Sequence, residues 1–182
     1  AKLYTEQTSS YGSLIGRPGL LFAMKDQPPR QQSFLVTLGS VMDTSSARVI
    51  VDPNLIDTSG LTSINWYVPS TDGKLVAVCM SRLGSELGTA YLFDVVTGKP
   101  LPDTVPRVNG PTAGGGLAWN ADNSGFYYTR YPHKGERAQS DLAFYQQVYF
   151  HKVGTSFAQD TYALGKDFPR IAEIELEASK DG

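Results

Sequence analysis

The sequence predicts an all-β fold built from repeated four-stranded units, and three features of its 182 residues support this prediction. First, short apolar runs rich in Val, Tyr, Phe, Leu and Thr alternate with Gly, Pro, Asp, Asn and Ser, as strands alternate with turns. Second, only 19% of the residues are charged whereas Gly (18) and Pro (11) are plentiful, which favours strands over long surface helices. Third, an apolar pattern recurs at a nearly fixed interval. The nearest candidate for a helix, residues 136–147, predicts at most a short turn inside a long loop.

The recurring pattern is an apolar strand followed by a short turn of Ser, Asp or Asn with Gly. It begins at Ile64, Leu117 and Ala172, so the copies start about 53–55 residues apart, near the range of radial and solenoid repeats. Each interval has room for four antiparallel strands, which is the pattern of a β-propeller blade. Thr97-Gly98 after Asp94 suits a tight reversal between a third and a fourth strand. A β-sandwich is the alternative, although a sandwich needs no internal repeat.

Strands can be placed in each unit in turn. The first unit, about residues 11–60, has expected strands near Gly19–Met24, Ser33–Leu38 and Ala47–Val51. The second unit, about 61–112, has expected strands near Ser63–Val68, Leu75–Ser81, Thr89–Val95 and Leu101–Val108. The third unit, about 113–170, has expected strands near Gly116–Asn120, Gly125–Arg130, Gln147–Val153 and Asp160–Leu164.

The last segment, residues 171–182, reads as the first strand of a fourth blade followed by its turn. Asp181-Gly182 is a strong marker of a tight turn between paired strands, yet no second arm follows it. We therefore expect a partial β-propeller of about three blades plus the first strand of a fourth, cut from a longer protein. Such a piece would expose two sheet faces that a closed ring buries, so we expect it to self-associate or to be marginally stable.

Composition excludes several classes of function. A formal net charge of −2 gives no electrostatic reason to expect nucleic acid or an anionic membrane surface as a partner. The single cysteine, Cys79, rules out an internal disulfide framework and a cysteine-built zinc site. No apolar run approaches the roughly 20 residues that span a bilayer. We expect no cofactor and no metal. A cytoplasmic location is favoured, and a periplasmic one is left open.

Four segments are more specific than the strand pattern. They are VDPNLIDTSG (Val51–Gly60), SRLGSELGTAYLFDVVTGKPLPD (Ser81–Asp103), LAWNADNSGFYYTRYP (Leu117–Pro132) and QQVYFHKVGTSFAQDTYAL (Gln146–Leu164). In order and spacing they resemble the N-terminal propeller domain of the prolyl oligopeptidase family of serine peptidases, and the likeness covers most of the chain from about Leu20 onward. One departure is that family members often carry a Trp shortly after the Gly-Ser of the second blade, where this chain has Glu86 and Leu87.

The resemblance implies a parent enzyme larger than this chain. Family members look like a seven-bladed propeller that caps an α/β-hydrolase domain and filters substrates for it. A Ser-Asp-His triad at the interface cleaves short peptides after proline. The implied partners of this piece are therefore the missing blades, the hydrolase domain and, for the parent, short proline-containing peptides. No substrate-contacting residue is carried over, because in the family these lie in later blades.

The catalytic signals are weak. An α/β-hydrolase nucleophile requires Gly-x-Ser-x-Gly, whereas Gly84–Gly88 reads GSELG, with the serine in the wrong place and no helix pattern after it. His133 falls in a solvated loop, and His151 falls in a strand where a half-buried, hydrogen-bonded imidazole is far commoner than a catalytic one. We assign no catalytic residue and expect the isolated chain to be inactive.

Other motifs have structural explanations. Gly114-Gly115-Gly116 lead into a strand and lack the Gly-Lys-Ser/Thr of a phosphate loop, so close backbone packing near the channel is favoured. Residues 52–60 lack the spacing of a calcium loop and predict a connection between blades, with Asx turns at Asp52 and Asn54.

The strand FYYTRY raises three further expectations. Alternation places Phe126 and Tyr128 on one face and Tyr127 on the other, in the packing between blades. Arg130 is expected to pair with a carboxylate of the adjoining blade, because a long cation at a strand end must pair or reach solvent. Cys79, among apolar neighbours, predicts a small buried thiol.

Three functions remain open, the first of them implied by the resemblance. The favoured one is a gating fragment of a prolyl oligopeptidase-like serine peptidase. The second is a stand-alone module that binds a peptide or protein partner through its blades, and the third is a β-domain that binds a sugar or another ligand. A stand-alone module should end on a completed blade with protected edges, whereas this chain ends within a predicted hairpin.

Overall fold

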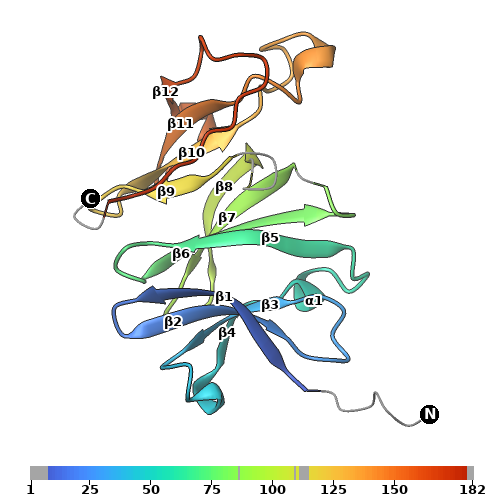
Figure 1. Cartoon of the computed structure of the whole chain (residues 1–182), viewed down its shortest axis with the longest axis vertical. Coiled ribbons are helices and arrows are strands. Elements are labelled where there is room, and N and C mark those ends of the chain that lie inside the picture. Colours follow the sequence, from blue (N-terminus) through green and yellow to red (C-terminus); the bar gives the residue numbers. More distant parts are fainter. Residues whose placement is uncertain (1–7, 86, 109, 111–114, 180–182) are drawn as a thin grey trace.

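Three four-stranded antiparallel units follow one another along the long axis of the molecule (Figure 1). The computed structural model describes residues 8–85, 87–108, 110 and 115–179. Blade 1 contains β1 (Ser10–Arg17), β2 (Leu20–Asp26), β3 (Phe34–Leu38) and β4 (Arg48–Val51). Blade 2 contains β5 (Thr62–Pro69), β6 (Leu75–Arg82), β7 (Gly88–Asp94) and β8 (Pro100–Val108). Blade 3 contains β9 (Leu117–Trp119), β10 (Gly125–Arg130), β11 (Gln147–Lys152) and β12 (Thr161–Leu164).

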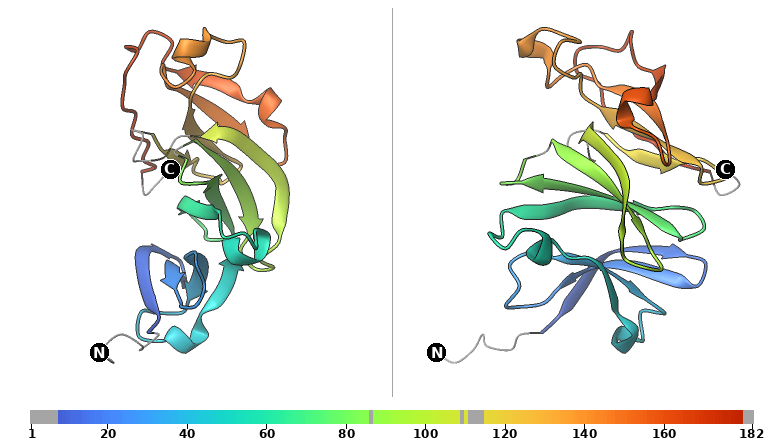
Figure 2. Two further views of the ribbon diagram at one scale, coloured as in Figure 1. Left: turned by 90° about the vertical axis from the view of Figure 1, so that its right-hand side faces the viewer. Right: turned by 180° about the vertical axis from the view of Figure 1, so that it is seen from behind.

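Within each blade the strands are paired in chain order, so each blade is a simple meander. Blade 1 is a sheet of its own, whereas blades 2 and 3 form one eight-stranded sheet. The link between them is narrow, because β8 and β10 share only the Val108–Arg130 pair. Figure 2 shows the blades following one another when the molecule is turned. The predicted all-β, partial-propeller fold is confirmed.

The strands expected in the three units are all present, with ends shifted by at most two residues. Strand β1 was missed. Its sequence SYGSLIGR has few apolar residues, and a bulge between Gly12 and Ile15, where Ser13 has φ +50°, breaks the alternation on which the prediction depends. The helical turn expected within residues 136–147 is the short 3₁₀ segment η3 (Gln139–Asp141).

The strand expected from Ala172 onward is not formed in the described residues. Residues 172–179 pair with no strand, and an isolated strand is not stable without a neighbour to satisfy its backbone. Instead Glu173–Leu176 run beside the inner strands, where they line a cavity of about 550 Å³ together with Trp66–Val68 of β5 and Gly115–Leu117. The turn expected at Asp181-Gly182 lies outside the described residues.

Two separate cores join the blades. Between blades 1 and 2, Phe22 and Leu35 pack on Tyr67, Val76 and Val78. Between blades 2 and 3, a second cluster contains Ala77, Ala90, Leu92, Val105, Val108, Leu117, Trp119, Phe126 and Tyr128. Alternate residues of β6 therefore face opposite cores, as the period of a strand requires.

The turns also tie neighbouring blades together. The Arg17 side chain at the end of β1 donates hydrogen bonds to the carbonyls of Pro69 and Ser70 in blade 2. One blade further on, the Thr71 backbone N–H donates to the Asn123 side chain at 2.8 Å. These hydrogen bonds join each blade to the next through the turn between the first two strands of the following blade.

The two outermost faces differ. On blade 1, Ala23, Phe34, Val36 and Leu38 are each at most 3% exposed, because Tyr11, Leu21 and Ala47 pack against them and the Arg30 guanidinium stacks on the Phe34 ring at 4.2 Å. The expectation of an open apolar face is therefore wrong for blade 1. The far face of blade 3 is more open, since Tyr127 is 43% exposed.

Candidate functional site

The serine-containing loop predicted as a turn lies between β6 and β7. The Ser85 carbonyl accepts a hydrogen bond from the Asn65 side chain, and the Ser85 hydroxyl lies at 3.2 Å from the Leu87 backbone nitrogen, whose N–H donates to it. Strand β7 begins at Gly88, so no helix follows the serine. Glu86, the point of departure from the family pattern, lies outside the described residues. The loop lacks the strand–turn–helix setting of a nucleophile.

Histidine 133 does not meet a nucleophile either. Its ring stacks on Phe157 with the centroids 5.7 Å apart, and its backbone N–H donates to the Glu136 carboxylate. Partial burial and the nearby Arg130 guanidinium hold the pKa of His133 below its usual value, with Glu136 opposing. The residue belongs to the packing of the loop that follows β10.

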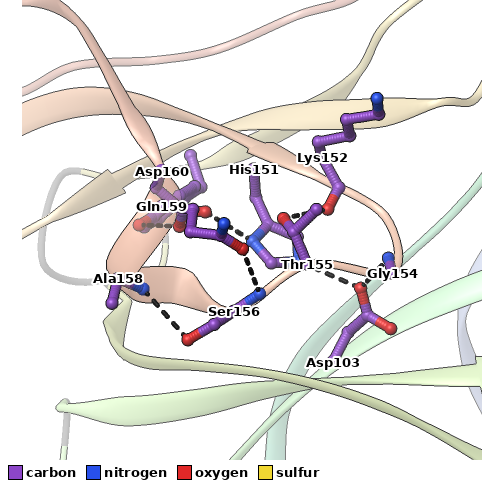
Figure 3. Close-up of polar contacts among 10 residues, drawn as sticks. Asp103, His151, Lys152, Gly154, Thr155, Ser156, Ala158, Gln159 and Asp160 are labelled. Atoms are coloured by element: carbon purple, nitrogen blue, oxygen red, sulfur yellow. Dashed lines mark hydrogen bonds and ion pairs between the residues drawn. The ribbon is translucent and has the colours of Figure 1, made fainter.

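The most unusual polar group in the described residues is a buried imidazole between two carboxylates (Figure 3). His151 Nδ1 lies 2.7 Å from Asp160 Oδ1, and its Nε2 lies 3.1 Å from Asp103 Oδ1. The side chains of His151 and Asp103 are 0% exposed and that of Asp160 is 2% exposed. The half-buried imidazole expected from the sequence is in fact completely buried.

Neighbouring groups complete this cluster. The Gly154 backbone N–H donates to Asp103 Oδ1 at 2.5 Å, and the Tyr128 hydroxyl donates to Asp160 Oδ2 at 2.7 Å. Burial strongly disfavours the ionised phenol, so the pKa of Tyr128 is raised and its proton stays in place; the Asp160 hydrogen bond and charge act in the same direction. For His151, burial alone would lower the pKa, but Asp160 and Asp103 outweigh it and the pKa is raised.

This arrangement differs from a catalytic dyad. A general base needs one ring nitrogen held by a carboxylate and the other free to reach a nucleophile. In His151 both nitrogens contact carboxylates, and neither reaches solvent. We conclude that the imidazole holds structure together in this chain.

Sequence reasoning missed the two carboxylates, although one left a signal. Asp103 shares its face of β8 with Leu101 and Val105, where alternation predicts an apolar residue. A charged residue in such a register must be paired. Asp160 gave no comparable signal, because it lies outside a strand, just before β12.

Arg130 pairs within its own blade, so the prediction of a partner in the adjoining blade is wrong. Its guanidinium makes two hydrogen bonds to Glu136, at 2.7 and 3.0 Å, and stacks on the Tyr149 ring at 3.8 Å. The long β10–β11 loop folds back over the strand end and brings Glu136 into contact with Arg130. The alternation predicted for this strand is confirmed, since Phe126 and Tyr128 are buried while Tyr127 is exposed.

The glycine run and the acidic connection have structural roles. A Cβ on Gly116 would lie 3.4 Å from the Leu176 backbone nitrogen, so backbone packs closely there; Gly114 lies outside the described residues. Asp52 accepts from the Asn54 backbone N–H at 3.0 Å and caps the short helix α1 (Pro53–Ile56). Asn54 instead bonds the Gln32 backbone, so the Asx turn predicted for it is wrong.

The remaining sequence expectations concern a thiol, metals and membranes. Cys79 is fully buried, and burial raises its pKa to about 12. Among the described residues, no group of three or more His, Cys, Asp or Glu side chains is placed to hold a metal ion. The same part of the chain contains no helix long and apolar enough to cross a membrane.

Comparison with known proteins gives a consistent result. Residues 6–182 match the family model for the N-terminal β-propeller domain of prolyl oligopeptidase. The chain is 35% identical over 125 residues to a prolyl endopeptidase of Elizabethkingia meningoseptica, covering 67% of this chain and 17% of that protein. It is 26% identical over 158 residues to prolyl oligopeptidase A of Galerina marginata, covering 79% of this chain and 21% of that one.

Solved structures share the fold. One from a study of two prolyl endopeptidases superposes with a TM-score of 0.84 at 21% identity, over 97% of this chain and 25% of the other. Prolyl oligopeptidase B of Galerina marginata, bound to a 35-residue substrate, gives 0.72 at 21% identity, over 89% and 25%. The chain thus spans a quarter or less of the length of these proteins. It belongs to the prolyl oligopeptidase family and lies in that family's N-terminal β-propeller domain.

Proposed function

We propose that this chain is the gating part of a prolyl-specific serine peptidase. In that enzyme, blades 1–3 form part of a ring that filters short proline-containing peptides before they reach an α/β-hydrolase domain. The observation that carries the proposal is the match of residues 6–182 to the family's propeller domain. Solved relatives bound to peptide substrates support it, because they combine this fold with peptide cleavage or macrocyclisation.

The proposal separates gating from chemistry. Cleavage of a peptide bond requires a nucleophile, a base and an oxyanion hole. In the described part of the chain, His151 is enclosed by carboxylates and His133 is stacked in a loop, so no described serine has a free imidazole beside it. The chain's contribution is to shape access to the active site, and the hydrolysis belongs to the hydrolase domain.

The first test is an activity assay of the purified chain with a Gly-Pro reporter peptide. We expect no cleavage above background, and no labelling by a serine-reactive phosphonate. A matched assay of a complete family member from the same source organism is the positive control. Cleavage that the phosphonate abolishes would overturn the division between gate and catalyst.

The second test is to read the source reading frame beyond Gly182. We expect about four further blades, then Gly-x-Ser-x-Gly and, later, the Asp and His of a triad. A stop codon directly after Gly182 would contradict the gating proposal. It would leave a stand-alone β-module that binds a peptide or protein partner as the better explanation.

A further inference from the structure

The buried Asp103–His151–Asp160 cluster joins two blades. Asp103 belongs to β8 of blade 2, whereas His151 on β11 and Asp160 before β12 belong to blade 3. The hydrogen bond from His151 to Asp160 therefore lies within blade 3, and the one to Asp103 crosses the junction. The same junction also contains the second core and the Thr71–Asn123 hydrogen bond, whereas β8 and β10 themselves are paired only at Val108 and Arg130.

The proton count of the cluster follows from hydrogen-bonding chemistry. An ionised carboxylate can only accept, so each of the two bonds needs an N–H on the imidazole. Neutral histidine has one N–H and one lone pair, and only the imidazolium has an N–H on both nitrogens. With Asp103 and Asp160 ionised, both contacts are favourable only when His151 is charged.

We propose that Asp103, His151 and Asp160 form a pH-responsive latch that holds blade 2 against blade 3, closed when His151 is an imidazolium and released across the junction when it is neutral.

The geometry indicates which bond deprotonation breaks. The contact of Nδ1 with Asp160 is shorter, 2.7 Å against 3.1 Å, so a neutral ring keeps its proton on Nδ1. The lone pair on Nε2 then faces Asp103 Oδ1, and attraction becomes repulsion. The Gly154 N–H is then the one described hydrogen bond left to Asp103, because its Oδ2 has no partner among the described residues, and we expect the repulsion to weaken this bond as well.

The groups around the ring support a charged state. Strand β8 presents Asp103, the segment before β12 presents Asp160, and β10 presents the Tyr128 hydroxyl and the Phe126 ring, whose centroid is 5.1 Å from that of His151. Two carboxylates thus face one imidazole. Burial lowers the pKa of His151, but the two carboxylates raise it further, so that the net shift is upward.

The direction of the pH effect follows. A group whose folded pKa is raised binds its proton more tightly in the folded state. Its contribution to stability is complete below the unfolded value of about 6.5 and is lost as the pH rises through the higher folded value. The latch is therefore closed in mildly acidic solution and weakens toward alkaline pH.

The neighbouring junction provides an internal contrast. Between blades 1 and 2, the Arg48 side chain donates to the carbonyls of Val95 and Val96, in the turn that follows β7. A guanidinium stays charged throughout the accessible pH range, and carbonyls do not titrate. A change of pH near neutrality thus acts on the junction between blades 2 and 3 and leaves the other unchanged.

The chain allows a direct measurement, because it contains only two histidines. We would titrate the ¹⁵N-labelled chain and follow both imidazoles by long-range ¹H–¹⁵N NMR. We expect His151 to lose its proton at a higher pH than His133, because the pKa of His151 is raised and that of His133 is lowered. A His151 that is neutral at pH 6.5 would overturn the proposal.

The junction itself is followed through backbone amides in the same samples. Gly154 donates to Asp103 across the junction, whereas Gly98 donates to the Asp94 carbonyl within the β7–β8 turn of blade 2, next to the backbone of Val49 and Ile50 in blade 1. After correction for intrinsic exchange rates, we expect the protection of Gly154 to fall between pH 6 and pH 9 while that of Gly98 stays constant. If the protection of both amides changes with pH in the same way, the pH effect is not specific to the junction between blades 2 and 3, and the proposal fails.

Variants then separate a latch from mere packing. His151→Gln removes the titrating group, and His133→Gln is the matched control. Each unit by which the folded pKa exceeds the unfolded one is a tenfold change in the ratio of folded to unfolded chain. We expect urea unfolding of His151→Gln to lose the alkaline fall in stability, and His133→Gln to keep it. Equal pH dependence in His151→Gln and the unaltered chain would contradict the latch.

If His151→Gln does not fold, Asp103→Asn tests the same point. The amide keeps an oxygen acceptor, and it removes one of the two charges that hold the proton on His151. We expect the pKa of His151 in the NMR titration to fall relative to the unaltered chain. An unchanged value would show that Asp103 does not control the charge of the ring.

Discussion

At the scale of single residues, Gly88 lies where close packing against a neighbouring side chain leaves no room for a Cβ. Gly88, the first residue of β7, faces the fully buried Cys79 of β6, and a Cβ there would overlap Cys79 Sγ. The backbone cannot move far at this position, because Gly88 pairs with Val108 of β8 in the same sheet. The sulfur and the missing methyl group are therefore two parts of one packing arrangement.

We predict that Gly88→Ala destabilises the chain by about 1–3 kcal/mol, the usual cost of overpacking a core. Cys79→Ala removes Sγ, so the double variant Gly88→Ala/Cys79→Ala should recover much of that loss. Urea unfolding of the four proteins in the cycle measures the coupling. If the effects of the two substitutions simply add, the proposed contact between them is contradicted. Gly84→Ala is the control for backbone strain alone, because Gly84 has φ +70° and no neighbour within 4 Å of an added Cβ.

Sequence and structure agree best where a residue's role is local. The alternation of β10 and the buried thiol of Cys79 follow from the period of a strand and from apolar neighbours. The partners of Arg130 and His151 could not be predicted, because Glu136 and Asp103 reach them through a loop fold and a blade junction. The positions of these residues in the sequence do not show that Arg130 meets Glu136 or that His151 meets Asp103.

At the scale of elements, the long β10–β11 loop is held by stacked cations. Arg130 lies on Tyr149 and bonds Glu136, Arg137 lies on the Tyr145 ring at 3.7 Å, and Arg170 lies on the Phe144 ring at 3.4 Å. Such contacts are worth about 0.5–2 kcal/mol each, depending on burial. The loop is thereby ordered even though it has little regular structure of its own.

We predict that Glu136→Ala loosens this loop. The substitution leaves the Arg130 guanidinium, which is 7% exposed, without its carboxylate partner. We expect the free energy of unfolding to fall by about 1–3 kcal/mol. This value lies between those for surface and buried ion pairs, because Glu136 is itself 43% exposed. Limited trypsin digestion should cut faster after Lys134 and Arg137. Asp141→Ala, which removes a more exposed pair with Arg170, is the control and should change cleavage little.

The strand order was predictable from the sequence, whereas β1 and the segment after residue 171 were not. Turn chemistry marks most strand ends: Gly73 with φ +71° closes the β5–β6 turn, and Gly98 with φ +68° closes the β7–β8 turn. Strand β1 lacks a clean alternation because of its bulge. A segment such as Glu173–Leu176 has the alternation of a strand, but pairing also requires a partner, which a local pattern does not supply.

At the scale of the whole molecule, the open side lies on blade 3. Tyr127, Phe150 and Leu164 share the face that points away from blade 2, and Tyr127 and Leu164 are each 43% exposed. Blade 1, in contrast, covers its own outer face with Tyr11 and Arg30. The outer sheet face is therefore more open at blade 3 than at blade 1.

We predict that the isolated chain self-associates through blade 3. Sedimentation velocity over a hundredfold range of concentration should show a reversible dimer. Tyr127→Glu should shift the chain to monomer, whereas Met42→Glu, at a 91% exposed site on blade 1, should not. A monomer at every concentration with sharp two-state unfolding would contradict this prediction, and so would equal effects of the two variants.

The two cores lie on opposite sides of blade 2 and share no residue. Phe22 of the first and Phe126 of the second never meet, so a packing defect in one is not transmitted to the other by contact. Effects of substitutions far apart and without common partners add. Substitutions in the core between blades 1 and 2 consequently need no compensating substitutions in the core between blades 2 and 3. The residues of each core can therefore change independently of the other core, and blade 2 must remain complementary to both blade 1 and blade 3.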